Sequence, residues 1–187
     1  MARELIGVVL HVRSRDGECS GRIVEVEAYL GRDDAASHAW RGPTPRSKIM
    51  FGPPGTVYIY LIYGMHHCLN LVTEKEGEAG AVLIRAIEPL TGLELMAGRR
   101  GVGPGPGRNL QLCSGPGKLG RACGLDLGWN GLALSRGPGG KELPGCIWLT
   151  TPRERMGRVE STPRVGIRKA VDLRFRFIDP ASACLSC

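Results

Sequence analysis

The sequence predicts an α+β fold, a single mixed domain in which a curved antiparallel β-sheet is surrounded by short helices. Runs of β-branched and aromatic residues recur along the chain, and short turns separate most of them. The helical patterns between them are brief, and they form no β–α–β series. A length of 187 residues suits one domain. We expect that domain to span residues 1–187, with a flexible tail over about 180–187.

Strands are predicted wherever apolar residues run together or alternate with polar residues between turns. In chain order they cover residues 5–12, 21–29, 56–63, 66–72, 81–85, 132–134, 146–149 and 173–178. The first is a continuous apolar run, which is typical of a buried strand. The second alternates from Val24 onward, and the last alternates from Leu173 to Ile178.

The connecting segments carry the helix and loop signals. Residues 31–40 begin with turn and N-cap residues, which predicts a short helix or an irregular loop. Helices are also predicted at 93–96 and at 118–123, the second ending at Gly124. The stretch 101–120 is so rich in Gly and Pro that we expect a surface loop. A domain linker is less consistent with this composition, because neither the residues before the stretch nor those after it look able to fold as a separate domain.

Composition and charge limit the class of protein and of partner. With 42% hydrophobic and 23% charged residues, the chain is not a wholly disordered one. No apolar run approaches the length of a membrane span or of a signal sequence, so we expect a cytoplasmic protein with no membrane partner. The net charge of +7 favours a polyanionic partner. Of the 25 basic residues 20 are Arg, and a GC-rich genome, which favours Arg codons, would explain this excess of Arg equally well.

Several local motifs that suggest metal or cofactor chemistry lack the context it needs. The seven cysteines are scattered singly, which indicates reduced thiols, and the spacing of Cys184 and Cys187 has no second motif to complete a zinc site. Residues 115–120 match GxGxxG, but only a poor strand precedes them. His66 and His67 are adjacent on a predicted strand and point to opposite faces. We therefore expect neither a metal nor a cofactor.

Two carboxylates on the second predicted strand are candidates for acid–base chemistry. Glu25 and Glu27 are two residues apart, so their side chains share one face with Tyr29. The opposite face is apolar and carries Val24, Val26 and Ala28. An alternating pair of carboxylates is usually a solvated strand face, but the company of Tyr29 and His38 also suits a catalytic acid or base.

The tyrosines are concentrated in one part of the chain. Aromatic residues make up only 5% of the sequence, yet all four tyrosines fall between positions 29 and 63. Tyr58, Tyr60 and Ile62 share one face of a predicted strand, and Tyr63 begins a Tyr-Gly-Met turn at its end. Such a stripe is typical of a packed core. The same rings also suit stacking on a nucleobase.

Longer motifs around these residues resemble one family. Residues 21–30, 37–46 and 50–65 closely resemble the alkyladenine (3-methyladenine, methylpurine) DNA glycosylase family. The likeness continues, in order, through residues 68–70, 83–89, 113–119, 134–138 and 163–167.

The resemblance implies a base-excision repair enzyme that acts on damaged double-stranded DNA. Such an enzyme flips a damaged purine, of the 3-methyladenine, hypoxanthine and ethenoadenine class, and hydrolyses its N-glycosidic bond. It also implies a monofunctional glycosylase without lyase activity. We expect it to act as a monomer, associated with the nucleoid in a prokaryote.

The same resemblance implies roles for individual residues. Glu27 matches the general base that deprotonates the attacking water, and Arg85 matches an active-site arginine near the base and the sugar-phosphate backbone. The base-binding positions are matched by Tyr29, His38, Tyr60 and Asn70, of which Asn70 rejects the exocyclic amine of guanine. Tyr63 matches the side chain that wedges into the minor groove, with Met65 beside it.

Two other functions stay open on the residues alone. A non-catalytic nucleic-acid-binding module on the same fold would bind damaged and intact duplex equally. Fold kinship with the formyltransferase C-terminal domain would allow an RNA-directed or formyltransferase-like role, by analogy of fold only. The presence of Glu27, His38 and Asn70 together favours the glycosylase, because a binding module needs none of them.

Overall fold

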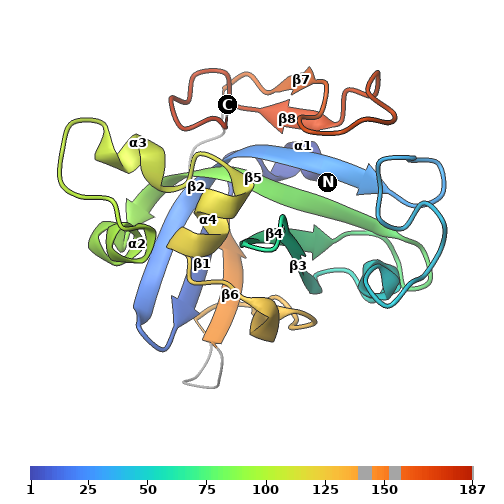
Figure 1. Ribbon diagram of the computed structural model, residues 1–187, viewed down its shortest axis with the longest axis horizontal. Helices are drawn as coiled ribbons and strands as arrows, with labels where there is room; N and C mark the ends of the chain where they lie inside the picture. Colours follow the sequence, from blue (N-terminus) through green and yellow to red (C-terminus); the bar gives the residue numbers. More distant parts are fainter. Residues whose placement is uncertain (139–144, 152–156, 187) are drawn as a thin grey trace.

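The computed structural model describes residues 1–138, 145–151 and 157–186, and its main feature is a curled antiparallel sheet (Figure 1). Six strands follow one another across it in the order β3-β4-β5-β2-β1-β6, and β8 pairs with both β2 and β7. The strands are β1 (Val9–Ser14), β2 (Gly17–Leu30), β3 (Val57–Ile62), β4 (His66–Val72), β5 (Gly80–Thr91), β6 (Gly145–Thr150), β7 (Glu160–Thr162) and β8 (Arg176–Ile178). The predicted α+β fold with a curved antiparallel sheet is confirmed.

Short helices surround the sheet. They are α1 (Ala2–Leu5), α2 (Leu93–Arg100), α3 (Arg108–Leu112) and α4 (Pro116–Ala122), with 3-10 turns η1 (Lys48–Phe51) and η2 (Leu127–Trp129). Met96, Leu112 and Leu119, one from each of α2, α3 and α4, are fully buried in the main core together with apolar residues of the strands. Burial of these faces, rather than helix propensity, stabilises such short helices.

The long strand β2 is central to the arrangement. One of its edges pairs with β5, and the other pairs first with β1 and then with β8. The pairing with β5 shifts register between Ile23 and Glu25 and again between Glu25 and Val26. Such β-bulges bend a strand and re-aim its side chains. The neighbour of β2 changes from β1 to β8 at this irregularity.

Because of this bulge, Val24 lies on a different face of the sheet from the one predicted. Val24 was expected beside Val26, but it packs with Ala86 and Cys184, whereas Ile23 and Val26 both belong to the main core. The extra residue at the bulge turns Val24 to the opposite face.

Helix α4 lies unusually close to β4. A Cβ atom at Gly120 would overlap the carbonyl oxygen of His67, and one at Gly117 would lie 2.7 Å from Cγ of His66. Both positions therefore need glycine for the helix to approach the strand. Close packing of this kind accounts for two glycines of the GxGxxG match.

Several element boundaries differ from the prediction. The run 5–12 contains a break at Gly7, whose φ of +90° separates α1 from β1. The Gly-rich stretch 101–120 holds α3 and most of α4, because Gly107 and Gly115 adopt positive φ just before the two helices begin. Residues 132–134 make an isolated bridge rather than a strand.

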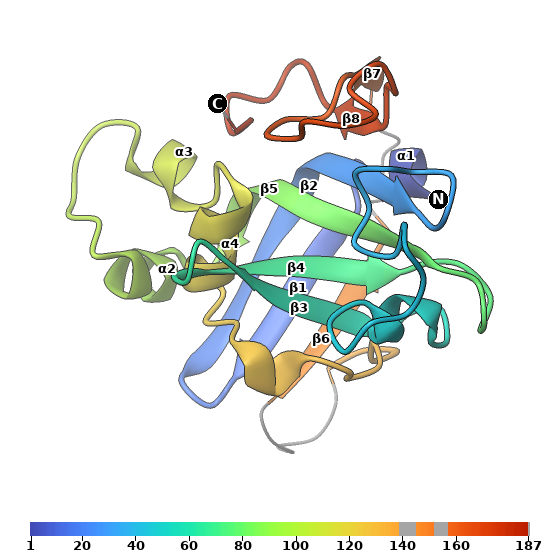
Figure 2. The same ribbon diagram turned by 45° about the vertical axis from the view of Figure 1, so that its right-hand side comes forward.

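At the C-terminal end, β7 was not predicted, and β8 covers only the last part of the predicted strand 173–178. The final described residues lie beside β2 and β5 (Figures 1 and 2), where Cys184 packs against Val24 and Ala86 in the middle parts of the two strands. Cys184 is buried there, while Cys187 lies outside the described residues. The flexibility expected of residues 180–187 stays a prediction, although the described tail packs on the sheet. No helix in the described parts of the chain is long and apolar enough to cross a membrane.

Candidate active site

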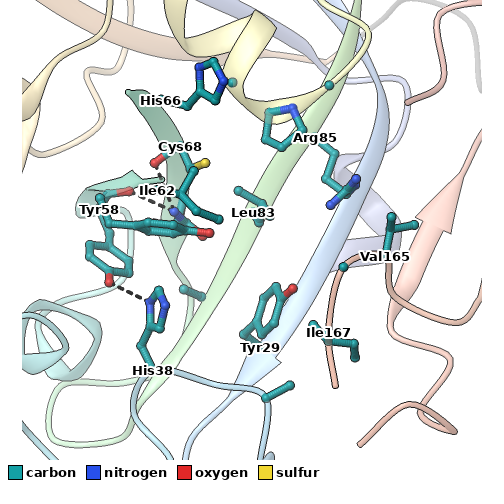
Figure 3. A pocket seen from close by; sticks show the side chains of 18 of the residues that line it. Tyr29, His38, Tyr58, Ile62, His66, Cys68, Leu83, Arg85, Val165 and Ile167 are labelled. Carbon is teal, nitrogen blue, oxygen red and sulfur yellow. Dashed lines mark hydrogen bonds between the residues drawn. The ribbon is translucent and has the colours of Figure 1, made fainter. Parts of the chain in front are cut away.

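A pocket of about 620 Å³ lies between the β3–β4 hairpin, strands β2 and β5, the start of α4 and the segment 165–169 (Figure 3). This volume is in the range of small-molecule sites. The predicted site residues that line it are Tyr29, His38, Tyr60, Tyr63, Asn70 and Arg85. The fold thus brings together residues from four separate strands, the loop that holds His38 and the β3–β4 turn that holds Tyr63. Glu27 and Met65 do not line the pocket.

Glu27 lies directly behind the pocket wall. Its carboxylate is fully buried, and Oε1 accepts a hydrogen bond of 2.7 Å from the backbone N–H of Val165. Oε2 accepts one of 2.8 Å from the Tyr29 hydroxyl and one of 3.3 Å from Nη1 of Arg85. All three donors line the pocket, so one layer of side chain and backbone separates the carboxylate from the cavity.

Arg85 lies between the two carboxylates of β2. Its Nε donates to Oε1 of Glu25 over 2.7 Å, while Nη1 points toward Glu27. Burial alone would raise the pKa of Glu25, but hydrogen bonds from Arg176 and Ser186 and the charge of Arg85 outweigh it and lower that pKa. Glu25 is therefore an anion in the folded protein at neutral pH.

Aromatic rings form two sides of the pocket, with Tyr29 on one side and Tyr58 and His38 on the other (Figure 3). Tyr60 also lines the pocket and packs against Tyr58 and His38. The rings of Tyr58 and Tyr60 are 5.5 Å apart, and His38 packs edge-on to Tyr60 at 4.7 Å. The Tyr58 hydroxyl lies 3.0 Å from Nδ1 of His38. Tyr58, to which the family resemblance gave no role, therefore orients His38.

His38 is a neutral side chain at neutral pH. Its partial burial in the pocket wall, together with the nearby charge of Arg46, lowers its pKa to about 4. A neutral imidazole can stack on a purine without adding a positive charge to the pocket. It also keeps one ring nitrogen as an acceptor.

Asn70 is fixed on β4 within the hairpin. It is buried, and its Nδ2 donates to the backbone carbonyls of Tyr58 and Cys68 over 3.1 and 3.2 Å. These two bonds use both N–H groups of the amide. The side-chain oxygen is left as the group that can meet a ligand in the pocket.

Tyr63 and Met65 project from the tip of the β3–β4 hairpin. Tyr63 is 80% exposed and Met65 is 68% exposed, which is unusual for large apolar side chains. The backbone φ angles of Tyr63 and Gly64 are +54° and +70°, the pattern of a tight primed hairpin turn. A residue other than glycine at positive φ is strained, and such strain is common at functional positions.

Two groups of residues at the site were not predicted from the sequence. Arg164 and Asp34 form a buried ion pair behind Tyr29, with Nη2 of Arg164 and Oδ1 of Asp34 2.7 Å apart. At the rim, the exposed lysines Lys118 and Lys169 line the pocket. The motif 163–167 was the only signal for Arg164, and Lys118 lies at the end of the motif 113–119.

Comparison with known proteins identifies the family of this chain. The family model described as Methylpurine-DNA glycosylase matches residues 1–183. The chain belongs to this family.

Similar proteins of the methylpurine-DNA glycosylase family occur in archaea and bacteria. A protein of Methanoculleus marisnigri is 46% identical over 95% of this chain and 87% of its own length. Relatives from Rhodopseudomonas palustris and Prosthecochloris aestuarii are 47% and 45% identical, over 95% and 94% of this chain and 77% and 80% of their own lengths. All three carry the name "Putative 3-methyladenine DNA glycosylase". Membership of the family supports the predicted class, a hydrolase of DNA repair that acts on DNA.

Proposed function

We propose that this protein is a monofunctional DNA glycosylase that flips a damaged purine out of duplex DNA and hydrolyses its N-glycosidic bond. The observation that carries the proposal is the meeting of an aromatic clamp and a buried carboxylate at one pocket. Tyr29 belongs to both, because its ring lines the cavity and its hydroxyl binds Glu27. We assign the substrates to the 3-methyladenine, hypoxanthine and ethenoadenine class.

Entry of the base into the pocket requires the nucleotide to leave the stack, which costs a few kcal/mol. Tyr63 stands exposed beside the pocket that it also lines, so its ring can fill the space left in the duplex. Met65, at the same tip, lies where it can contact the neighbouring base pairs. The rigid turn holds both side chains outward before DNA arrives.

The walls favour an electron-poor purine. A base stacked between Tyr29 and the Tyr60 ring gains cation–π attraction of about 0.5–2 kcal/mol when alkylation has made it cationic. Asn70 also lines the pocket, and we assign to its side chain the steric exclusion of the guanine exocyclic amine. For neutral lesions, stacking and shape must supply the selectivity.

In the chemical step, the oxygen of a water molecule forms a bond to C1′ of the deoxyribose while the bond from C1′ to the purine nitrogen breaks. The electron pair of that bond leaves with the purine. The proton of the water passes, by way of the Tyr29 hydroxyl that lines the pocket and donates to Glu27, to the Glu27 carboxylate, which we place as the general base. Arg85 lies beside Glu27 at the pocket surface and orients the carboxylate and the flanking phosphate.

Water, rather than an amine of the protein, is the proposed nucleophile. Two lysines line the pocket, but Lys118 donates to the Ser114 hydroxyl over 3.2 Å and Lys169 lies 4.5 Å from the centre of the Trp40 ring. Both are exposed at the rim, where they suit contacts with phosphates. Borohydride should therefore trap no covalent complex between the protein and lesion DNA.

The test is base release from duplex oligonucleotides that contain hypoxanthine, ethenoadenine or 3-methyladenine. We expect alkali-labile sites with the parent protein and a loss of at least about 100-fold in rate for Glu27→Gln. Glu18→Gln is the matched control, because Glu18 pairs with Arg13 at the surface, remote from the pocket. No release from any lesion, or full activity of Glu27→Gln, would overturn the proposal. Equal binding of damaged and intact duplex without release would instead support the non-catalytic module.

A further inference from the structure

Glu25 is the second carboxylate at the site, and the function proposed above gives it no role. It is fully buried and does not line the pocket. Its Oε1 lies 2.7 Å from Nε of Arg85 and 2.7 Å from Nε of Arg176. The backbone N–H of Ser186 donates to Oε2 over 2.6 Å. Residues from β5, β8 and the C-terminal tail thus meet at one carboxylate of β2.

Ser186 connects Glu25 to Arg85 a second time. Its hydroxyl donates to Oε1 of Glu25 over 2.7 Å. The hydroxyl oxygen of Ser186 also accepts a hydrogen bond of 2.9 Å from Nη2 of Arg85. Arg85 is therefore held along one edge, through Nε and Nη2, by a carboxylate and a serine. Its remaining nitrogen, Nη1, faces Glu27 at 3.3 Å, which is long for a charge-assisted hydrogen bond.

This arrangement decides which carboxylate holds the arginine. Without Glu25 and Ser186, no other hydrogen bond from a described residue would hold the far edge of the Arg85 guanidinium and keep it from closing a short pair with Glu27. A tight pair would occupy the carboxylate that must accept a proton. The geometry instead gives the strong contacts to Glu25 and leaves Glu27 with the weak one.

The tail is built to hold Ser186 in place. Cys184 is buried against Val24 and Ala86, and Val24 faces it because of the bulge in β2. Arg176, on β8, fixes Glu25 from the other side. The bulge, β8 and the tail thus converge on the orientation of Arg85.

We propose that Glu25, Arg176 and Ser186 are positioning residues for base excision, and that the C-terminal segment is part of the active site because it orients Arg85. The inference rests on the proposed function, since it concerns the efficiency of the same reaction. None of the three residues touches the pocket, and each acts through Arg85.

The test compares single-turnover excision rates with affinity for lesion DNA. Ser186→Ala should lower the rate constant at saturating enzyme by about tenfold, and Glu25→Gln by up to about 100-fold, the loss expected when a catalytic group is misplaced. Affinity for the lesion duplex should stay within about twofold, because the pocket walls and the hairpin are unchanged. Ser186→Thr retains the hydroxyl and should restore the parental rate.

Ser182→Ala is the matched control, because the Ser182 hydroxyl lies in the same tail and accepts only from the backbone N–H of Cys184 among the described residues. It should leave the rate unchanged. An unchanged rate for Ser186→Ala, or an equal loss in Ser186→Ala and Ser186→Thr, overturns the inference. A parent protein that releases no base overturns the proposed function instead, so the two failures are distinguishable. If Glu25→Gln does not fold, the serine variants still decide the question.

Discussion

The guanidinium carbon of Arg164 lies 4.6 Å from the centre of the Tyr29 ring, so a cation backs the aromatic wall of the pocket. The Arg164 side chain is fully buried, and its charge is balanced by Asp34, which is also fully buried. Tyr29 in turn donates its hydroxyl to Glu27. The ring is thereby held from behind and at its tip, and a purine entering the pocket meets a surface whose position is already set.

Loss of the cation behind Tyr29 should destabilise the fold. Arg164→Met leaves Asp34 as a buried anion without its partner, and we expect the free energy of unfolding in urea to fall by about 3–5 kcal/mol. The double variant Asp34→Asn with Arg164→Met should recover much of this loss. The asparagine carries no charge, and its single oxygen can keep one of the two backbone hydrogen bonds that Asp34 accepts from Leu30 and Ala36. A loss below about 1 kcal/mol for Arg164→Met would contradict this account.

The same pair makes stability depend on pH. Burial alone would raise the pKa of Asp34, but hydrogen bonds from Arg164 and from backbone N–H groups lower it below its ordinary value of 3.8. The unfolded chain therefore takes up this proton at a higher pH than the folded protein does. Stability from Asp34 is fully present above the ordinary pKa and is lost as the pH falls through the folded value. Urea midpoints measured from pH 6 down to pH 3 should show this fall, and Asp34→Asn should make it shallower.

The outline of the fold and most of the pocket could be predicted from the sequence, because the strands and the motifs around Tyr29, His38 and Tyr60 are local patterns. Arg164 and Ser186 could not be placed in the same way. Arg164 contacts Asp34, which lies 130 residues earlier in the chain. Ser186 contacts Glu25, which lies 161 residues earlier. Only the tertiary fold creates those pairs, and no periodicity records them.

The predicted face of Val24 was wrong for a different reason. Strict alternation places it with Val26, and a bulge of one residue breaks that alternation without a clear sequence signal. The Gly-rich stretch 101–120 was likewise predicted as a loop, because glycine composition does not distinguish a loop from the positive-φ residues that precede α3 and α4.

His38 should stay neutral at neutral pH. An NMR titration of its imidazole should show a midpoint near pH 4, because partial burial and the charge of Arg46 both lower its pKa to about 4. Arg46→Gln should move the midpoint upward but keep it below the ordinary value of 6.5, since burial is the larger cause. A midpoint at or above 6.5 in the parent protein would show that the imidazole is solvated and free of this environment.

Two glycine-to-alanine changes in neighbouring helices should have opposite effects on the free energy of unfolding. Gly120→Ala places a methyl group against the carbonyl of His67 and should cost at least about 1–3 kcal/mol by forcing α4 away from β4. Gly98→Ala, in α2, adds a methyl group with nothing within 4 Å and should gain about 0.5–1 kcal/mol from helix propensity. Urea unfolding of both variants measures the difference. Equal effects would mean that the contact between α4 and β4 is not tight.

The backbone conformation of Tyr63 should lower the stability of the fold, whereas its exposed side chain should contribute to recognition of DNA. Its φ of +54° costs a residue with a Cβ about 1–2 kcal/mol, and its side chain is 80% exposed, so it contributes little packing. Tyr63→Gly relieves the strain and loses part of that gain through the larger entropy of the unfolded chain. We expect a net stabilisation of roughly 0.5–1 kcal/mol in urea.

The same substitution should weaken binding to a lesion duplex and slow base excision, because nothing then fills the space that the flipped nucleotide leaves. Tyr63→Ala is the matched control, since it also removes the ring but keeps a Cβ at positive φ. It should lose binding as Tyr63→Gly does without becoming more stable. If both variants bind the lesion duplex as tightly as the parent, the hairpin tip does not enter the DNA, and the exposure and strain of Tyr63 need another explanation.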